Sequence, residues 1–466
     1  MIISATNKFP FNLGCGIGLA ISLACWLAAA TPAQAQPRLD LNYAAAWDRL
    51  LAESDQLRAA EAGVRGRQAQ AEASRKLRQP EVGLDLRQLN YQKSLDFSLG
   101  SLAPVLGQIG IPDPLEYQLD GWRTRPVVTL NMPLYTGGRI TAAQAAAEAA
   151  VRGAESERYG ATESLASLLA QAYFGQQLAA RALGVRADVL AGLEQHLQRA
   201  EALEREGLIS RAPRLQAQVA RDEAAREHAL AQSQLAVAEA VLAGLLRSDA
   251  TIAPTTPLFV LPQGVEHTAA PPPPGPHPRL QQLDALVDQS RAGIQAEAAR
   301  LRPTVFAFGQ YDFYRDDALF TEPDWIYGIG LRFTLLSNQG RRESLRAARE
   351  QAAQVESGLE EARVQLAMLT TRTASGLESA RIQFELLESS LALAQENLRL
   401  QAISFREGQA TSLDVIDAQL GLGRARIQRA QAAHEYVLSL AAWLEATGRA
   451  SALASLVNHP DRIIVE

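Results

Sequence analysis

Cysteine is nearly absent from this chain of 466 residues: only Cys15 and Cys25 occur, and both lie before residue 36. The remainder of the chain therefore offers no disulfide and no thiol nucleophile. Methionine is as rare, because Met132 and Met368 are the only ones after the first residue, and a methionine relay for soft metals lacks support. The histidines are scattered without metal-ligand spacing; they are His196, His228, His267, His277, His434 and His459.

Signals of catalysis and of polyanion binding are also missing. The chain contains no serine nucleophile elbow and no phosphate-binding loop. Gly137-Gly138-Arg139 opens a helix after a strand but lacks the rest of a nucleotide fingerprint. The net charge is −6, and arginine is spread along the chain beside glutamate, which is typical of solvated helix faces. We therefore expect no enzymatic activity, no cofactor, no bound metal and no nucleic-acid partner.

Residues 1–35 have the features of a signal peptide. Leu13–Ala30 is unbroken and apolar, and Ala33-Gln34-Ala35 fits a signal peptidase site, so we expect cleavage before Gln36. An uncleaved membrane anchor is the alternative, whereas Ser22-Leu23-Ala24-Cys25 matches a lipoprotein signal poorly. No second long apolar run follows. If the exported chain crosses a membrane, it must therefore do so as a closed β-barrel.

The chain repeats itself after 201 residues. Arg205-Glu206-Gly207 returns as Arg406-Glu407-Gly408, and in both copies an Ala-Gln pair follows the glutamate at the same distance. Upstream, the segment 133–139 that ends in Gly-Arg is echoed by 336–341. Each echo falls at the same place in a pattern of helix, two strands, very long helix, glycine turn and helix. A tandem repeat of this size fixes the architecture before any local motif does.

Long helices are predicted for most of the chain. Aromatic residues make up only 6%, and long tracts are rich in Ala, Glu, Gln, Arg and Leu. We expect helices at Asp40–Leu77 and from Arg139 to about Glu206, the latter on the order of 100 Å long. Residues at seven-residue spacing favour coiled-coil packing over an ordinary amphipathic helix; they are Leu183, Leu190 and Leu197 in the first copy, with Leu193 and Ala200 at the intermediate positions, and Leu377, Phe384, Leu391, Leu398, Phe405, Ala380, Leu387 and Ala394 in the second.

Four segments have a period of two instead and are predicted strands, at about 80–95, 124–136, 303–314 and 325–336. Each is long enough to cross a bilayer, although a half-buried soluble sheet is the alternative. Trp325 and Tyr327 stand at a strand end and suit an interfacial aromatic girdle. Four strands cannot close a barrel, so the chain must oligomerise to hide its sheet edges. A dimer would give eight strands and a trimer twelve, and the pattern does not choose between them.

These elements divide the chain into two structural repeats, 36–250 and 279–448, with hairpin tips near 207 and 408. Residues 251–278, which contain four consecutive prolines, are expected to be an extended linker. Residues 449–466 are expected to form a C-terminal tail that is partly disordered.

The chain resembles the TolC-like outer-membrane efflux protein family from roughly Leu39 to Gly448. The resemblance rests on the duplicated Gly-Arg, on the Arg-Glu-Gly turns and above all on the segment Phe405–Gln419. It implies a homotrimer with one twelve-stranded barrel in the outer membrane, continued by an α-helical tunnel through the periplasm. It also implies the role of exit duct for tripartite efflux pumps or type I secretion systems, whose partners are a periplasmic adaptor and an inner-membrane transporter.

The resemblance assigns expected roles to two groups of residues. The hairpin tips, where each glycine is also expected to end a helix in the left-handed conformation, would dock the adaptor; they are Glu206, Gly207, Leu208, Glu407, Gly408 and Gln409. Asp414 and Asp417 share a helix face and match paired aspartates at the tunnel constriction. Three copies would give rings of six carboxylates that favour cations and raise one another's pKa. The alternative is that both merely suit the first turn of a helix.

The chain departs from the family at the bonds that close the tunnel entrance. Where the family has polar closing residues, this sequence has Phe405, Ala410 and Pro213. We therefore expect Phe405 to contribute packing at the constriction, with other contacts from Arg406 or Arg211. Two other functions are weighed, a periplasmic coiled-coil adaptor or scaffold without a barrel and a soluble secreted enzyme. Within the family, drug, metal and protein substrates all stay open.

Overall fold

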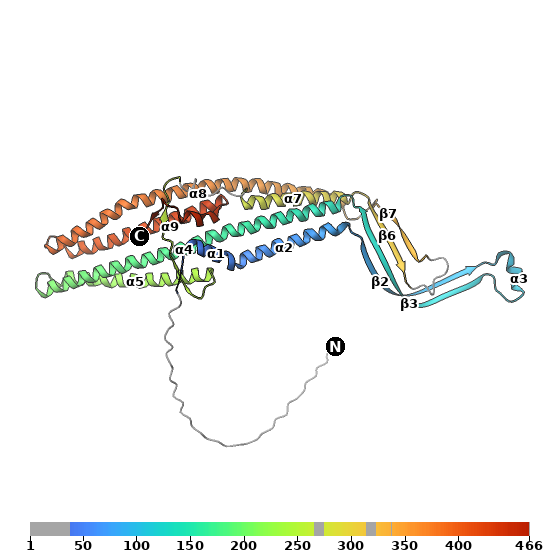
Figure 1. The fold of residues 1–466 in the computed structure, drawn as a ribbon, viewed down its shortest axis with the longest axis horizontal. Helices are drawn as coiled ribbons and strands as arrows, with labels where there is room; N and C mark the ends of the chain where they lie inside the picture. The colour runs from blue at the N-terminus through green and yellow to red at the C-terminus, as the bar shows by residue number, and fades with distance from the viewer. Residues whose placement is uncertain (1–37, 265–274, 314–322, 337, 466) are drawn as a thin grey trace, which may run out of the picture. The chain divides into compact units, whose positions relative to one another are not determined.

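The computed structural model describes residues 38–264, 275–313, 323–336 and 338–465, and Arg38 onward forms one compact unit (Figure 1). The expected signal peptide and the four prolines lie outside the described residues. The elements follow in this order: β1 (Arg38–Leu41), α1 (Tyr43–Glu53), α2 (Asp55–Arg75), η1 (Lys76–Arg78), β2 (Glu81–Phe97), η2 (Gly100–Leu102), α3 (Ala103–Gly107), β3 (Leu115–Tyr135), α4 (Arg139–Arg205), α5 (Arg211–Leu245), β4 (Thr251–Pro254), β5 (Phe259–Val260), α7 (Pro278–Ala299), β6 (Thr304–Asp312), β7 (Trp325–Arg332), α8 (Arg341–Arg406), α9 (Ser412–Ala446), η3 (Ala450–Ala452), α10 (Leu453–Leu456) and β8 (Ile463–Ile464).

The two longest helices, α4 with 67 residues and α8 with 66, begin and end at glycines. Gly138 and Gly340 precede them in the left-handed conformation. Gly207 and Gly408 end them with φ of 72° and 73°, which only glycine adopts at little cost. Each end is closed by a backbone bond across the turn, 2.9 Å in the first hairpin and 2.8 Å in the second. The chain therefore turns at the predicted positions with a left-handed glycine in each turn, and the role of these turns as docking tips stays a prediction.

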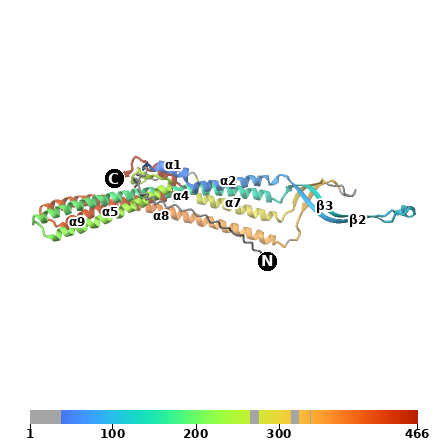
Figure 2. The same cartoon turned by 90° about the horizontal axis from the view of Figure 1, so that it is seen from below.

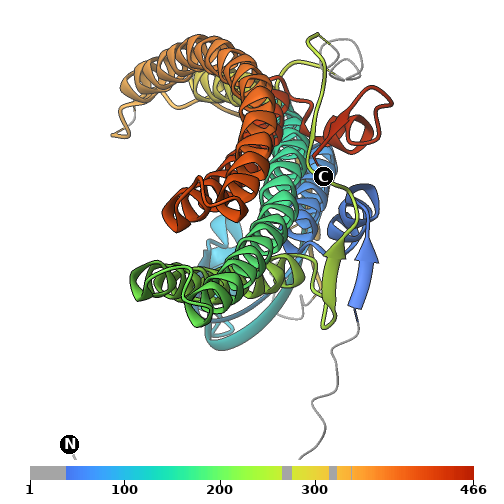
Figure 3. The same ribbon diagram turned by 90° about the vertical axis from the view of Figure 1, so that its left-hand side faces the viewer.

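The long helices pair as hairpins, α4 with α5 and α8 with α9, and the two hairpins contact each other through α4 and α9 (Figure 3). Residues at the predicted seven-residue spacing face the partner helices: Leu193, Ala200, Leu377 and Phe384 are all at most 3% exposed. Alanine at many of these positions lets the helix axes approach closely. Within the described residues, no helix is both long and apolar enough to span a membrane.

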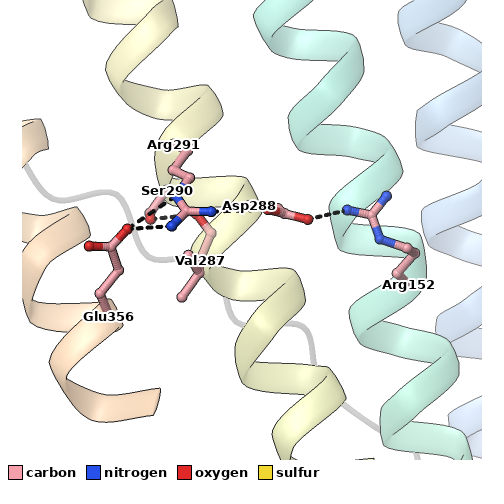
Figure 4. Close-up of polar contacts among 6 residues, drawn as sticks. All are labelled: Arg152, Val287, Asp288, Ser290, Arg291 and Glu356. Atoms are coloured by element: carbon pink, nitrogen blue, oxygen red, sulfur yellow. Dashed lines mark hydrogen bonds and ion pairs between the residues drawn. The ribbon is translucent and has the colours of Figure 1, made fainter. Parts of the chain in front are cut away.

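Between these hairpins and the sheet, α2, α4, α7 and α8 pack in that order (Figure 2). Polar side chains join three of them across one level (Figure 4). Arg152 of α4 donates to Asp288 of α7 at 2.7 Å, and Arg291 of α7 donates to Glu356 of α8 at 2.8 Å. All four side chains are about half exposed, so each pair stabilises by at most about 1 kcal/mol. Their effect is to align the helices more than to hold them together.

The sheet lies at the opposite end of the long helices from the tips (Figure 1). Its order is β2-β3-β6-β7 and every pairing is antiparallel. One face is apolar across all four strands: Leu84, Val128, Tyr311 and Trp325 align in one row. The other face is mixed: Phe306 and Phe308 lie on it together with polar groups, among them Thr129 beside Gln310 and an Arg125–Asp312 ion pair at 2.5 Å. The bounds differ from those predicted, because β3 begins at Leu115 and β7 ends at Arg332.

The expected linker and tail are in part folded, which corrects both predictions. β4 pairs in parallel with β1, and β5 pairs with β8 from the end of the chain. Ile252, Phe259 and Val457 are fully buried, and Leu453 nearly so. These short apolar segments gain stability by covering the aromatic core around Tyr173, although each is too short to show a period in the sequence.

The predicted helix Asp40–Leu77 is divided at Ser54. Ser54 has extended backbone, and its hydroxyl oxygen accepts from the backbone N–H of Leu57 at 3.3 Å, so it caps the start of α2. The residues before Tyr43 belong to β1 and to the cap of α1. A serine cap inside a helical pattern was the missed signal.

Candidate functional site

The two hairpin tips are exposed. Leu208 is 67% exposed. Glu206 and Glu407 are the exposed residues that follow the last turns of α4 and α8. Behind the first tip, Arg214 of α5 pairs with Glu204 of α4 at 2.7 Å, and both side chains are largely buried. The first tip therefore presents one apolar side chain on a stiffened support.

The two aspartates near the second tip differ in what they do. The carboxylate of Asp414 accepts from the backbone N–H of Thr411 at 2.7 Å, and the backbone N–H of Asp414 donates to the Thr411 hydroxyl oxygen at 3.3 Å, which forms a capping box at the start of α9. The carboxylate also accepts from that hydroxyl at 2.6 Å. The two bonds to the carboxylate, the hydroxyl first, hold the pKa of Asp414 below its usual range. Asp417 is exposed and makes no hydrogen bond or ion pair to any residue that the structure describes. The Thr-x-x-Asp spacing was a readable signal for this cap.

His196 joins all four helices near the tips. It lies on α4, is 2% exposed, and its Nε2 is 2.6 Å from the hydroxyl of Ser412 on α9. That hydroxyl donates to the carbonyl of Pro213 on α5 at 3.5 Å. The ring of Phe405, from α8, lies against the His196 ring with centroids 5.0 Å apart. We call His196, Ser412, Pro213 and Phe405 the hairpin junction.

The contact between His196 and Ser412 fits either tautomer of the imidazole, because Nε2 is 2.6 Å from the hydroxyl, whereas that hydroxyl is 3.5 Å from the carbonyl of Pro213. The Nδ1 of His196 is buried and meets no partner among the described residues. Burial first, and then the charge of Arg199, lower the pKa of His196. A second proton on the ring would therefore be costly in this arrangement.

Arg406 and Arg211, from which further contacts at the constriction were expected, make no bond to another helix within the described part of the chain. The Nε of Arg406 donates to Ala402 in its own helix, and Arg211 makes no bond to another described residue. Sequence reasoning did place Phe405 and Pro213 at this level. It missed the contact between His196 and Ser412 because the two residues are 216 positions apart and His196 stands in no motif.

Trp325 and Tyr327 both lie on the apolar face of the sheet, 63% and 82% exposed. Trp325 packs against the ring of Tyr311 with centroids 4.6 Å apart. Their position suits the predicted girdle, whose role stays a prediction. Within residues 38–264, 275–313, 323–336 and 338–465, no group of three or more His, Cys, Asp or Glu side chains could hold a metal ion.

The profile of the outer membrane efflux protein family matches residues 46–246 and 276–449. The fold is similar to that of CusC (TM-score 0.72, 17% identity, 88% of this chain and 92% of that chain). It is also similar to VceC of Vibrio cholerae, with a TM-score of 0.69 and 18% identity over 87% of this chain and 95% of that chain. The open state of MtrE of Neisseria gonorrhoeae has a TM-score of 0.66 and 18% identity over 88% of this chain and 89% of that chain. No curated protein sequence matches the chain.

Proposed function

Because this chain belongs to the outer membrane efflux protein family, its place is the outer membrane, and we propose that it is the passive exit duct of a tripartite efflux pump or a type I secretion system. In this proposal three copies share one twelve-stranded barrel. Their long helices continue as a tunnel through the periplasm to a periplasmic adaptor and an inner-membrane transporter. The partners supply substrate and energy, and the duct supplies only a path.

The apolar face of the sheet is the observation that carries this proposal. Val82, Leu84, Ile329 and Leu331 are each between 64% and 72% exposed on that face. A soluble sheet would bury these side chains, whereas lipid would cover them at no cost. β2 and β7 are also unpaired edges within the described chain, and neighbouring copies would pair them.

The proposal is tested by reconstituting the detergent-purified protein in a planar bilayer. A trimer that fractionates with the outer membrane and gives single-channel currents supports the duct. A protein that stays in the periplasmic fraction as a soluble oligomer would instead support a scaffold without a barrel.

We further propose that the tips dock the adaptor, with Leu208 as the apolar contact of the first tip. Leu208→Asp should weaken adaptor binding by at least about tenfold, since burying a leucine contributes about 1.5–3 kcal/mol. The control is Leu393→Asp, a leucine 72% exposed on α8 away from both tips. Surface plasmon resonance with the purified adaptor measures both. Equal losses in the two variants would show that Leu208 has no special part.

At the constriction we propose a ring formed chiefly by Asp417, because Asp414 is engaged in its capping box. A trivalent cation added on the periplasmic side should block the current, and Asp417→Asn should raise the half-blocking concentration about tenfold or more. Asp414→Asn should also weaken the start of α9, by about 1 kcal/mol, and thereby lower thermal stability. Block that survives in the Asp417→Asn variant would rule out the ring.

A further inference from the structure

A pocket of about 380 Å³ lies where the sheet meets the helices, and arginine dominates its lining. The duplicated Gly-Arg of the repeat contributes one arginine from each copy, at the first residues of α4 and α8. No Asp, Glu or Lys lines the pocket. The five arginines are Arg139, Arg300, Arg302, Arg332 and Arg341.

Most of this positive charge is not neutralised within the described chain. Only Arg300 has a carboxylate partner there, Glu297 at 3.0 Å. Arg302 donates to the carbonyl of Gly137 at 3.0 Å, and Arg341 donates to the carbonyl of Arg300 at 2.8 Å. Neutral carbonyls orient these guanidinium groups without cancelling their charge.

Two observations point to a missing acceptor. The Nε–H of Arg341 is buried and has no hydrogen-bond partner among the described residues. The guanidinium of Arg332 lies over the ring of Phe306, 5.2 Å from its centroid, and bonds to no carboxylate that the structure describes. Gly330 makes this stack possible, because a β-carbon there would come within 2.6 Å of the Phe306 ring. An unsatisfied buried donor beside several aligned cations is costly unless an anion completes the group.

The pocket opens on the mixed face of the sheet. Phe306 and Arg332 point to the same side as Gly330, opposite to Ile329 and Leu331 of the apolar face. If the apolar face meets lipid, as the proposed function requires, the pocket faces the inside of the duct at the junction of barrel and tunnel. The inference below therefore rests on the proposed function.

We propose that this pocket binds the anionic group of solutes that pass through the duct, a phosphate, a sulfonate or a carboxylate. Guanidinium groups bind such groups through paired, charge-assisted hydrogen bonds. The N-termini of α4 and α8 begin at the pocket and add partial positive charge. Three copies would place fifteen arginines around one level of the lumen. The low-dielectric wall of a narrow lumen strengthens the electric field of such charges.

Titration calorimetry on the detergent-purified trimer with inorganic pyrophosphate tests the site directly. The variant is Arg139→Gln/Arg332→Gln, since neither side chain makes a hydrogen bond or ion pair to another described residue and folding should not depend on them. The control is Arg65→Gln/Arg67→Gln, which removes the same charge from the exposed face of α2. We expect binding in the parent and control, and about tenfold or more weaker binding in the variant. No binding to the parent, or equal binding to all three, overturns the site.

Single-channel recording separates this outcome from the fate of the duct. Pyrophosphate added on the barrel side should reduce the current of the parent, and less so that of the variant. Current that pyrophosphate leaves unchanged would keep the duct and overturn the lumenal site. A phospholipid phosphate is the other source of the same chemistry. If phosphatidylglycerol in nanodiscs displaces pyrophosphate, whereas phosphatidylcholine does not, the pocket faces lipid and the lumenal proposal is wrong.

Discussion

Ile329→Arg is expected to abolish stable insertion of the chain in the outer membrane. Ile329 is 72% exposed in the middle of β7, and it aligns with Ala307 and Met132 on the apolar face. An arginine on the lipid face of a membrane strand costs about 2–4 kcal/mol near the midplane. Summed over three copies, this cost is about 6–12 kcal/mol, which is comparable to the free energy of unfolding of a whole domain.

The measurement is membrane fractionation combined with electrophoresis of unheated samples, which shows whether a folded oligomer is present. Gln310→Arg is the matched control, because Gln310 is exposed on the mixed face of the neighbouring strand. It should leave both readouts unchanged, since a charge facing water inside a barrel costs little. Equal behaviour of the two variants would mean that the two faces of the sheet do not differ in environment, and the barrel would have to be abandoned.

The elements with a sustained period were predictable from the sequence. The heptad positions around Leu193 and Phe384 repeat over many turns, so tertiary contacts had little power to override them. Gly207 and Gly408 were predictable because a left-handed residue at the end of a helix is a local requirement. The alternation of apolar with polar or small residues in β2 and β7 likewise predicted which side chains share a face of the sheet.

Features made by distant residues were not predictable. β5 has two residues and pairs with β8 some 200 residues later, so neither segment carries a period. The contact between His196 and Ser412 depends on how two hairpins lie against each other. The arginine pocket brings together arginines from four separate segments of the chain, and only the repeated Gly-Arg indicated that two of them are equivalent. Short-range patterns specify elements, whereas sites of this kind depend on the packing between them.

Acidification is expected to open the tunnel entrance, with His196 as the sensor. We propose that the hairpin junction holds the entrance closed in the arrangement described here. Burial and Arg199 lower the pKa of His196 in that arrangement, whereas a ring freed by separation of the hairpins would titrate near its ordinary value of about 6.5. The open state then binds more protons, so the closed state loses stability as the pH falls below about 6.5. Single-channel conductance at the periplasmic entrance should rise over that range.

Two substitutions separate the sensor from simple packing. His196→Gln should remove the rise in conductance on acidification. It should also raise the conductance at neutral pH, because each of three copies loses a buried contact of about 1 kcal/mol. Together these losses lower the ratio of closed to open channels about a hundredfold. Phe405→Ala should also raise the conductance but keep its rise on acidification, since the imidazole still titrates. His434→Gln is the control, because burial also lowers the pKa of His434, which lies on α9 but outside the junction.

If the conductance of the His196→Gln variant still rises on acidification, another residue senses the pH and the junction is a passive contact. A rise lost in the His434→Gln variant as well would indicate a general loss of stability in acid. The expected pattern is loss in the first variant alone, because the buried His196 ring contacts Ser412 across the two hairpins, whereas His434 lies outside the junction although one of its ring nitrogens is also buried without a partner in the described chain. A second proton on the His196 ring would have to be expelled or the hairpins would have to part, which couples the charge of one side chain to the width of the entrance.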